Sequence, residues 1–252
     1  VVRPVTFAAY SGSTTWTDKA GETYQATLRD EDLSPTKEKK AWQAILDPTG
    51  QWIQHVIKEA DERLLNLRKF GMPDAGGLIL ASDQEAAKKY AELVRKLTKS
   101  KPTIVISDDT KASRHIDTFA AAQDDDHRWM IAVRMVSEGV DVPRLAVGIW
   151  ATNYRTPLFF AQAVGRFVRA RKPGESATVF LPAVRPLLAL AAELEEERNH
   201  IIGLHQDDAE PEEFDSTVPD DDEEEEKVRQ EIEVLGSEAS FDHILFNGKA
   251  LL

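Results

Sequence analysis

The strongest constraint on the fold is an alternation between short apolar runs and longer amphipathic stretches, which extends from residue 77 to about residue 203. Short runs rich in valine, isoleucine and leucine are typical of strands buried in a parallel sheet. The stretches between them have the spacing of helices that pack on one side. The pattern predicts an α/β fold, a parallel sheet flanked by helices, with strands at residues 78–81, 103–107, 128–133, 145–150 and 177–181.

Four helices are predicted in the same region, at residues 84–98, 113–123, 157–171 and 186–202. The third of these has clear signals at both ends. Thr156 is a suitable N-cap, Pro157 occupies the first helical position, and Pro173 and Gly174 follow the predicted end. These signals delimit the helix that carries the most informative residues of the chain.

The flanking segments divide the chain into further parts. Residues 1–33 alternate weakly and predict a strand or hairpin, and residues 35–70 predict two helices separated by a break at residues 47–50. We expect the second of these helices to dock on the sheet through Trp52, Val56, Ile57 and Leu64. The predicted organisation is a lead-in at residues 1–70, a core domain at 71–205, an acidic linker at 206–226 and an extension at 227–252.

The net charge of −13 disfavours a nucleic-acid partner at first sight, because phosphates attract lysine and arginine. The charge is concentrated, however, between residues 207 and 226, where acids occur without a single base. This segment is interpreted as a solvated linker, with a nucleic-acid mimic as the alternative. The extension at residues 227–252 regains apolar residues, so it packs either back on the domain or on sequence outside this chain.

The composition excludes several classes of protein. The chain has no cysteine, and its six histidines lack the spacing of metal ligands, so no disulfide and no structural zinc site is expected. No apolar run approaches the ~20 residues that cross a bilayer, and no signal peptide is recognisable. We expect a cytoplasmic protein without membrane contact. The chain begins at Val1 rather than at methionine, which favours a piece of a longer protein.

A group of polar residues lies on the helix predicted at residues 157–171. Gln162, Arg166 and Arg169 are spaced by three to seven positions, which predicts that they share one helical face. Gly165 keeps this face low enough for a backbone or a phosphate to approach. Two adjacent guanidiniums require an anion opposite them, and their planar donors suit phosphate oxygens. A polyphosphate is the expected partner; the alternative is an exposed basic face that makes ordinary ion pairs.

These residues resemble motif VI of the superfamily 2 helicases, Gln-x-x-Gly-Arg-x-x-Arg, at every fixed position. The resemblance implies a RecA-like domain in which Arg166 and Arg169 act as arginine fingers on the γ-phosphate of ATP. It also implies that Gln162 senses the same phosphate and that Gly165 lies against the nucleotide.

Residues 134–143 resemble motif V of the same superfamily. The resemblance implies that the backbone of Gly139 approaches the phosphates and that Asp141 binds the ribose or positions an arginine finger. Arg134, Met135 and Ser137 would then face the nucleic-acid backbone. Many family members have a threonine near the start of this motif, where residues 133–134 read Val-Arg here. A simple turn is the alternative interpretation.

Two serines follow predicted strands. Ser82, at the junction of a strand and a helix, is placed to offer its hydroxyl and the helix N-terminal amides to a phosphate, and its context resembles motif IV. The alternative, compatible with that role, is a helix N-cap made by Ser82 or Asp83. Ser107 is a similar candidate for nucleic-acid contact, although a capping turn is the favoured interpretation of residues 107–110.

The chain contains no phosphate-binding loop of the form Gly-x-x-x-x-Gly-Lys-Ser/Thr. Asp61 and Glu62 resemble the Asp-Glu metal motif of the superfamily only in letters, and we interpret them as surface acids. ATP and Mg²⁺ are therefore expected to bind mainly to an N-terminal RecA-like domain outside this chain.

The expected function is that of the second motor domain of an ATP-dependent nucleic-acid helicase, inactive by itself. DNA is expected as the nucleic acid from the resemblance alone. Two alternatives remain open: a double-strand DNA translocase of the restriction or remodelling type, and a non-catalytic nucleic-acid-binding module.

Overall fold

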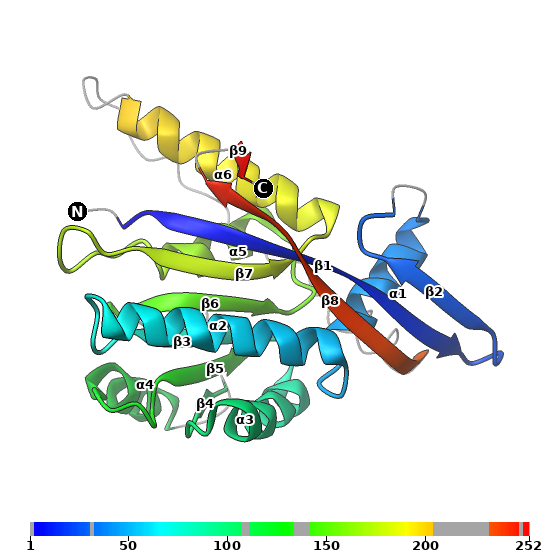
Figure 1. Ribbon diagram of the computed structural model, residues 1–252, viewed down its shortest axis with the longest axis horizontal. Helices are drawn as coiled ribbons and strands as arrows, with labels where there is room; N and C mark the ends of the chain where they lie inside the picture. Colours follow the sequence, from blue (N-terminus) through cyan, green and yellow to red (C-terminus); the bar gives the residue numbers. More distant parts are fainter. Residues whose placement is uncertain are drawn as a thin grey trace.

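A computed structural model describes residues 3–30, 33–106, 111–133, 142–203, 232–246 and 249–251 of the chain. The described strands form one sheet in the order β4-β5-β3-β6-β7-β1-β8-β9, and β2 pairs with β1 away from this path (Figure 1). Their bounds are Val5–Asp18 (β1), Thr23–Thr27 (β2), Gly76–Ala81 (β3), Thr103–Val105 (β4), Trp129–Val133 (β5), Leu145–Ala151 (β6), Ala177–Pro182 (β7), Ile232–Phe246 (β8) and Lys249–Leu251 (β9).

The central strands are parallel, and every residue of β3, β5, β6 and β7 is buried. β3 lies between β5 and β6, with Ile79 opposite Ile131 on one side and Ile149 on the other. Strands buried on both faces explain why their sequences are continuous apolar runs rather than alternating ones. The α/β class, with a mainly parallel sheet flanked by helices, is confirmed.

Helices cover both faces of this sheet (Figure 1). α2 lies in front of the sheet in that view, and α5 lies behind it. The right-handed crossovers of parallel strands place α3 and α5 on opposite faces, because their connections run in opposite directions along the sheet. The helix bounds are Pro35–Ile45 (α1), Gln51–Lys69 (α2), Gln84–Thr98 (α3), Ala112–Ala121 (α4), Pro157–Gly165 (α5) and Arg185–Gly203 (α6). Each described helix is too short or too polar to cross a bilayer.

α2 docks on the sheet as predicted. Trp52, Val56, Ile57 and Leu64 are all completely buried. The indole N–H of Trp52 donates a hydrogen bond of 3.0 Å to the carbonyl oxygen of Ser11, so the buried ring is also satisfied in its polar group. The helix thereby joins the N-terminal strand to the central sheet.

The N-terminal segment forms the predicted hairpin, β1 and β2, and it enters the central sheet. The first part of β1 pairs in parallel with β7, from Val5 opposite Ala177 to Tyr10 opposite Pro182. The second part pairs with β2, while β8 runs antiparallel along most of β1. The C-terminal extension therefore packs back on this chain, which was one of the two alternatives. The acidic segment at residues 206–226 lies outside the described residues.

Asp61 corrects one interpretation of the sequence, because it is a buried residue and not a surface acid. Its carboxylate accepts two hydrogen bonds from the guanidinium of Arg128, at 2.7 and 3.0 Å. The same carboxylate accepts the indole N–H of Trp129 at 2.7 Å. Only 8% of Asp61 and 6% of Arg128 is exposed, so this pair fixes α2 to the start of β5 in a dry environment.

Removing one partner of this pair leaves a buried charge without compensation. Asp61→Ala is expected to lower the free energy of unfolding by about 3 to 5 kcal/mol. Glu62→Ala is the matched control, since Glu62 is the exposed neighbour on the same helix. It is expected to change stability by no more than ~0.5 kcal/mol. Urea unfolding followed by circular dichroism measures both; equal effects of the two substitutions would contradict the structural role of Asp61.

Candidate nucleotide and nucleic-acid site

The helix α5 begins where the sequence predicts it to begin. The Thr156 hydroxyl accepts a hydrogen bond of 3.3 Å from the amide of Phe159, and Pro157 is the first helical residue. Phe160, Ala163 and Val164 form its buried side. Gln162 and Gly165 therefore lie on the side turned away from the sheet.

The predicted end of this helix at residue 171 is wrong, because α5 ends at Gly165 and Arg166 is its C-cap. The reason lies in contacts that follow the helix. The carbonyl of Val168 accepts a hydrogen bond of 2.7 Å from the amide of Arg3. The amide of Arg171 donates one of 2.9 Å to the carboxylate of Glu175. The Arg171 amide, used in this way, is not available for the hydrogen bond that a helix reaching residue 171 requires.

Phe167 completes the turn out of the helix. Its side chain is 1% exposed and lies over Gly148 of β6, where an added Cβ would come within 2.7 Å of the ring. Burial of this large ring stabilises the folded chain in the observed turn. The sequence from 166 to 171 is thus held as an irregular segment, which we call the arginine segment.

This geometry corrects the expected arrangement of the three polar site residues. Gln162 and Arg166 are four positions apart at the helix end and lie on the same side. Arg169 lies beyond the helix on the arginine segment, so the three do not share one helical face. Gln162 and Arg169 are exposed, and Arg166 is partly exposed. All three are accessible from outside the chain.

Gly165 has no internal reason to be a glycine among the described residues. A Cβ added there would meet nothing within 4 Å, and its backbone is not in the left-handed region. Helices disfavour glycine relative to alanine by up to ~1 kcal/mol. The position is therefore open surface beside Gln162 and Arg166.

Arg171, the last arginine of the segment, has a structural role. It donates hydrogen bonds of 2.5 and 2.9 Å to the two carboxylate oxygens of Asp74. These hydrogen bonds from Arg171 lower the pKa of Asp74 and raise that of Arg171. The resulting stabilisation is present above the ordinary pKa of a carboxyl group and is lost as the pH falls through the lowered pKa of Asp74.

Asp74 also contacts Arg144, a buried residue at the start of β6. The guanidinium of Arg144 donates to the carbonyl oxygens of Asp74 at 2.7 Å and Phe119 at 2.6 Å. It lies over the Phe119 ring, 4.6 Å from the centroid, and burial lowers its pKa to about 10. Asp74, in the short segment before β3, thus binds both Arg171, at the end of the arginine segment, and Arg144, at the start of β6.

A second group of contacts joins the same two regions. Arg3 is completely buried, and its guanidinium donates to the carbonyl oxygens of Pro143, at 3.0 Å, and Leu145. It also forms an ion pair of 2.7 Å with Glu175. Because the amide of Arg3 bonds to Val168, this one residue contacts the segment after Asp141 and the segment that carries Arg169.

The charge of Glu175 is maintained by its surroundings. Burial raises the pKa of this carboxyl group, but the hydrogen bonds from the Arg171 amide and the Arg3 guanidinium lower it by more. The net direction is downward, so Glu175 is ionised at neutral pH and compensates the buried charge of Arg3.

Ser82 lies at the carboxyl end of β3, where it leads into α3. The helix cap is made by Asp83, whose carboxylate accepts the Ala86 amide at 2.8 Å. Within the described parts of the chain, the Ser82 side chain has no recorded hydrogen bond. Its hydroxyl therefore remains available at the carboxyl ends of the parallel strands, where ligands of α/β domains bind.

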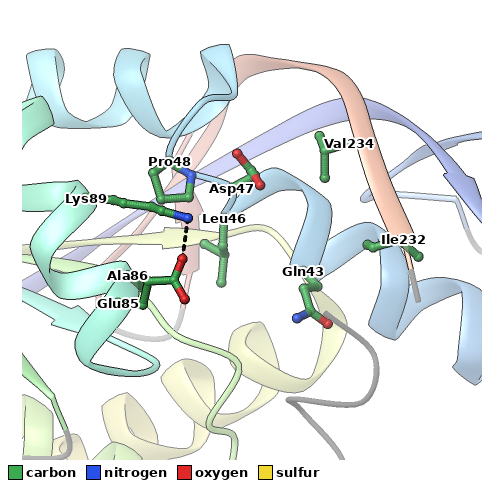
Figure 2. Close-up of a pocket in the computed structure, with 9 residues that line it drawn as sticks. All are labelled: Gln43, Leu46, Asp47, Pro48, Glu85, Ala86, Lys89, Ile232 and Val234. Carbon is green, nitrogen blue, oxygen red and sulfur yellow. Dashed lines mark ion pairs between the residues drawn. The ribbon is translucent and has the colours of Figure 1, made fainter. Parts of the chain in front are cut away.

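A pocket of about 210 Å³ lies near this edge, between α1, α3 and β8 (Figure 2). Figure 2 shows the ion pair between Glu85 and Lys89, 2.6 Å long, in its wall. Asp47 adds a second carboxylate, so the pocket has more negative than positive charge. This charge disfavours a polyphosphate, and the nucleotide is not assigned to it.

Six candidates from the sequence lie outside the described residues: Ser107, Arg134, Met135, Ser137, Gly139 and Asp141. Their roles stay predictions. In the described ranges, no three histidine, aspartate or glutamate side chains gather in a group able to hold a metal ion.

Sequence reasoning missed Arg3, Asp74 and Glu175, which shape the arginine segment. No local pattern marks them. Arg3 precedes an apolar strand as many surface bases do, and its partners Pro143 and Glu175 are 140 and 172 residues away. Only the pairing of β1 with β7 brings them together.

No family model matches this chain. It is 48% identical over 251 residues to an uncharacterized protein of Mycobacterium tuberculosis, an alignment that covers 99% of this chain and 41% of the relative. It is also 48% identical over 257 residues to an uncharacterized protein of Mycobacterium leprae, with the same coverage of 99% and 41%. The chain therefore spans less than half the length of these relatives.

Two of the solved structures to which this chain is similar are described by their alignments. Domain 2 of the DEAD-box helicase Mss116p, bound to an RNA duplex, is 18% identical with a TM-score of 0.42, covering 64% of this chain and 61% of that one. A fragment of a putative HsdR subunit of a type I restriction enzyme from Vibrio vulnificus is 16% identical with a TM-score of 0.46. That alignment covers 72% of this chain and 32% of that one.

Two glycines allow a matched test of this geometry. Gly165→Ala is expected to leave the free energy of unfolding unchanged or to raise it by up to ~1 kcal/mol, since the new methyl group meets nothing. Gly148→Ala is expected to lower it by about 1 to 3 kcal/mol, because the methyl group collides with the buried Phe167 ring. Thermal unfolding distinguishes them, and a strongly destabilised Gly165→Ala variant would contradict the open surface described here.

Proposed function

We propose that this chain supplies the second motor domain, residues 71–205, of an ATP-dependent nucleic-acid helicase of superfamily 2. An N-terminal RecA-like domain of the same protein would hold ATP and Mg²⁺ on its phosphate-binding loop. Arg166 and Arg169 act as arginine fingers on the γ-phosphate, and Gln162 senses it. The nucleic acid is DNA in this proposal, on the resemblance of the motifs.

The observation that carries the proposal is the convergence of two distant segments on Arg3. Pro143, two residues after Asp141, accepts a hydrogen bond from the Arg3 guanidinium, while Val168, next to Arg169, accepts one from its amide. Pro143, the last residue of the segment that resembles motif V, is therefore held close to Val168 of the arginine segment. A nucleotide-binding surface made from both motifs requires this proximity.

The surface of the helix end supports the same function. Gln162, Gly165 and Arg166 lie on the side of α5 turned away from the sheet, and Gly165 allows close approach. A guanidinium that is reachable from outside can bind a phosphate held by another domain. This arrangement fits a catalytic arginine better than a residue of the chain's own core.

The mechanism follows from closure of a cleft between the two motor domains. Closure brings Arg166 and Arg169 to the γ-phosphate, where they stabilise the charge that develops during transfer to water. Hydrolysis removes this attraction and the cleft opens. Because Ser82 and the other strand contacts belong to one domain, the cycle moves them relative to the contacts of the other domain, which is translocation.

The direct test is ATP turnover by the full-length protein. Arg166→Ala is expected to lower kcat by at least ~10³-fold, as removal of an arginine finger does, with little change in the KM for ATP. Lys172→Ala is the matched control, because it removes one exposed positive charge from the same region. It is expected to retain wild-type turnover.

The outcomes also separate the alternatives. Wild-type turnover by Arg166→Ala would contradict the proposal. A full-length protein that binds nucleic acid and hydrolyses no ATP would be a non-catalytic module. Nucleic-acid-stimulated hydrolysis without strand separation, together with displacement of a third strand from a duplex, would identify the translocase.

Ser82 is expected to contribute to nucleic-acid affinity and not to folding. Ser82→Ala removes one hydrogen bond to a charged phosphate, which at about 1.5 to 3 kcal/mol corresponds to roughly 10- to 150-fold weaker binding. The cap by Asp83 is unaffected, so the unfolding temperature should stay unchanged. Fluorescence anisotropy with labelled single-stranded DNA and RNA measures the affinity, and unchanged binding of both would remove Ser82 from the interface.

A further inference from the structure

We propose that Arg3 is a positioning residue for catalysis, which holds the arginine segment and the segment after Asp141 in the register that ATP hydrolysis requires. The inference rests on the proposed function and deepens it. It assigns a catalytic task to the start of the N-terminal strand, a part of the chain that carries no helicase motif.

The contacts of Arg3 reach three separate parts of the chain. Its amide donates to Val168 at 2.7 Å, and its guanidinium donates to Pro143 at 3.0 Å and to Leu145. The guanidinium also pairs with Glu175 at 2.7 Å. Each partner lies on or beside a segment proposed to contact the nucleotide. None of the partners belongs to the hairpin of β1 and β2, which Arg3 precedes.

Burial makes this arrangement specific. Arg3 is 0% exposed and Glu175 is 7% exposed, so neither charge is solvated by water and each depends on the other. The planar guanidinium donates in several fixed directions at once, which a lysine cannot reproduce. The same Glu175 oxygen that binds Arg3 accepts the Arg171 amide, which ties the end of the arginine segment to the same pair.

The position of Arg3 links stability to catalytic geometry. Val168 immediately precedes Arg169, and Pro143 follows Asp141 by two residues, so a shift at Arg3 displaces two residues that border the candidate positions. A misplacement of about 1 Å in a catalytic group lowers turnover by up to ~10²-fold. Arg3 itself does not reach the nucleotide, since its side chain is completely buried.

Two variants of the full-length protein test this role. In Arg3→Met combined with Glu175→Met, both buried charges are removed together, which such pairs often tolerate without loss of stability. In Arg3→Lys the charge is kept, but the fork of donors is lost. We expect both to lower kcat between about tenfold and about a hundredfold, with the KM for ATP and the affinity for nucleic acid unchanged.

Arg128→Lys is the matched control for loss of a buried guanidinium. Arg128 is buried and paired with Asp61, and its contacts are with Asp61, Asp125 and Thr98, none of which lies in the arginine segment. This variant should have a lower unfolding temperature and a wild-type kcat when assayed well below that temperature.

The outcomes separate this inference from the proposed function. Wild-type kcat in Arg3→Lys, or in a folded double variant, overturns the positioning role. A drop in kcat for Arg128→Lys as large as that for Arg3→Lys also overturns it, because general destabilisation would then be the cause. If Arg166→Ala abolishes turnover while Arg3→Lys does not, only the inference about Arg3 fails; if Arg166→Ala turns over normally, the proposed function fails.

Discussion

The buried ion pair between Arg3 and Glu175 is the interaction on which the candidate site depends. A guanidinium without access to water is tolerated only when its charge is compensated. Here Glu175 compensates the charge, and the carbonyl oxygens of Pro143 and Leu145 accept further hydrogen bonds, while the Nε–H of Arg3 has no partner among the described residues. Two main-chain groups that follow α5 bond to the same two residues: the carbonyl oxygen of Val168 accepts the Arg3 amide, and the Arg171 amide donates to the Glu175 carboxylate.

The central sheet could be predicted from sequence because its strands are buried on both faces and therefore continuously apolar. The bounds of α3 agree with the prediction at both ends, since Asp83 caps it and its apolar side is regular. The place of β1 inside the sheet could not be predicted. Its neighbours β7 and β8 follow more than 150 residues later, and a weak alternation of apolar residues does not specify a partner.

The arrangement of the candidate residues agrees with their sequence spacing in part. Gln162, Gly165 and Arg166 lie together on the outer side of α5, as their spacing predicts. Arg169 does not, because the contacts that end the helix come from Arg3 and Glu175, which no helical periodicity reveals. The sequence offered both Ser82 and Asp83 as N-cap of α3. The cap is Asp83, which accepts the Ala86 amide three residues later, so the Ser82 hydroxyl is not used as the cap.

The central claim is that Arg166 and Arg169 stabilise charge that appears on the γ-phosphate only during its transfer. The most direct measurement compares the affinity of the full-length protein for ADP with its affinity for ADP in complex with aluminium fluoride, a mimic of that charge. The claim predicts that Arg166→Ala combined with Arg169→Ala weakens binding of the aluminium fluoride complex by at least ~10²-fold and leaves ADP affinity unchanged. Equal affinities of the wild type and the double variant for the complex would contradict it.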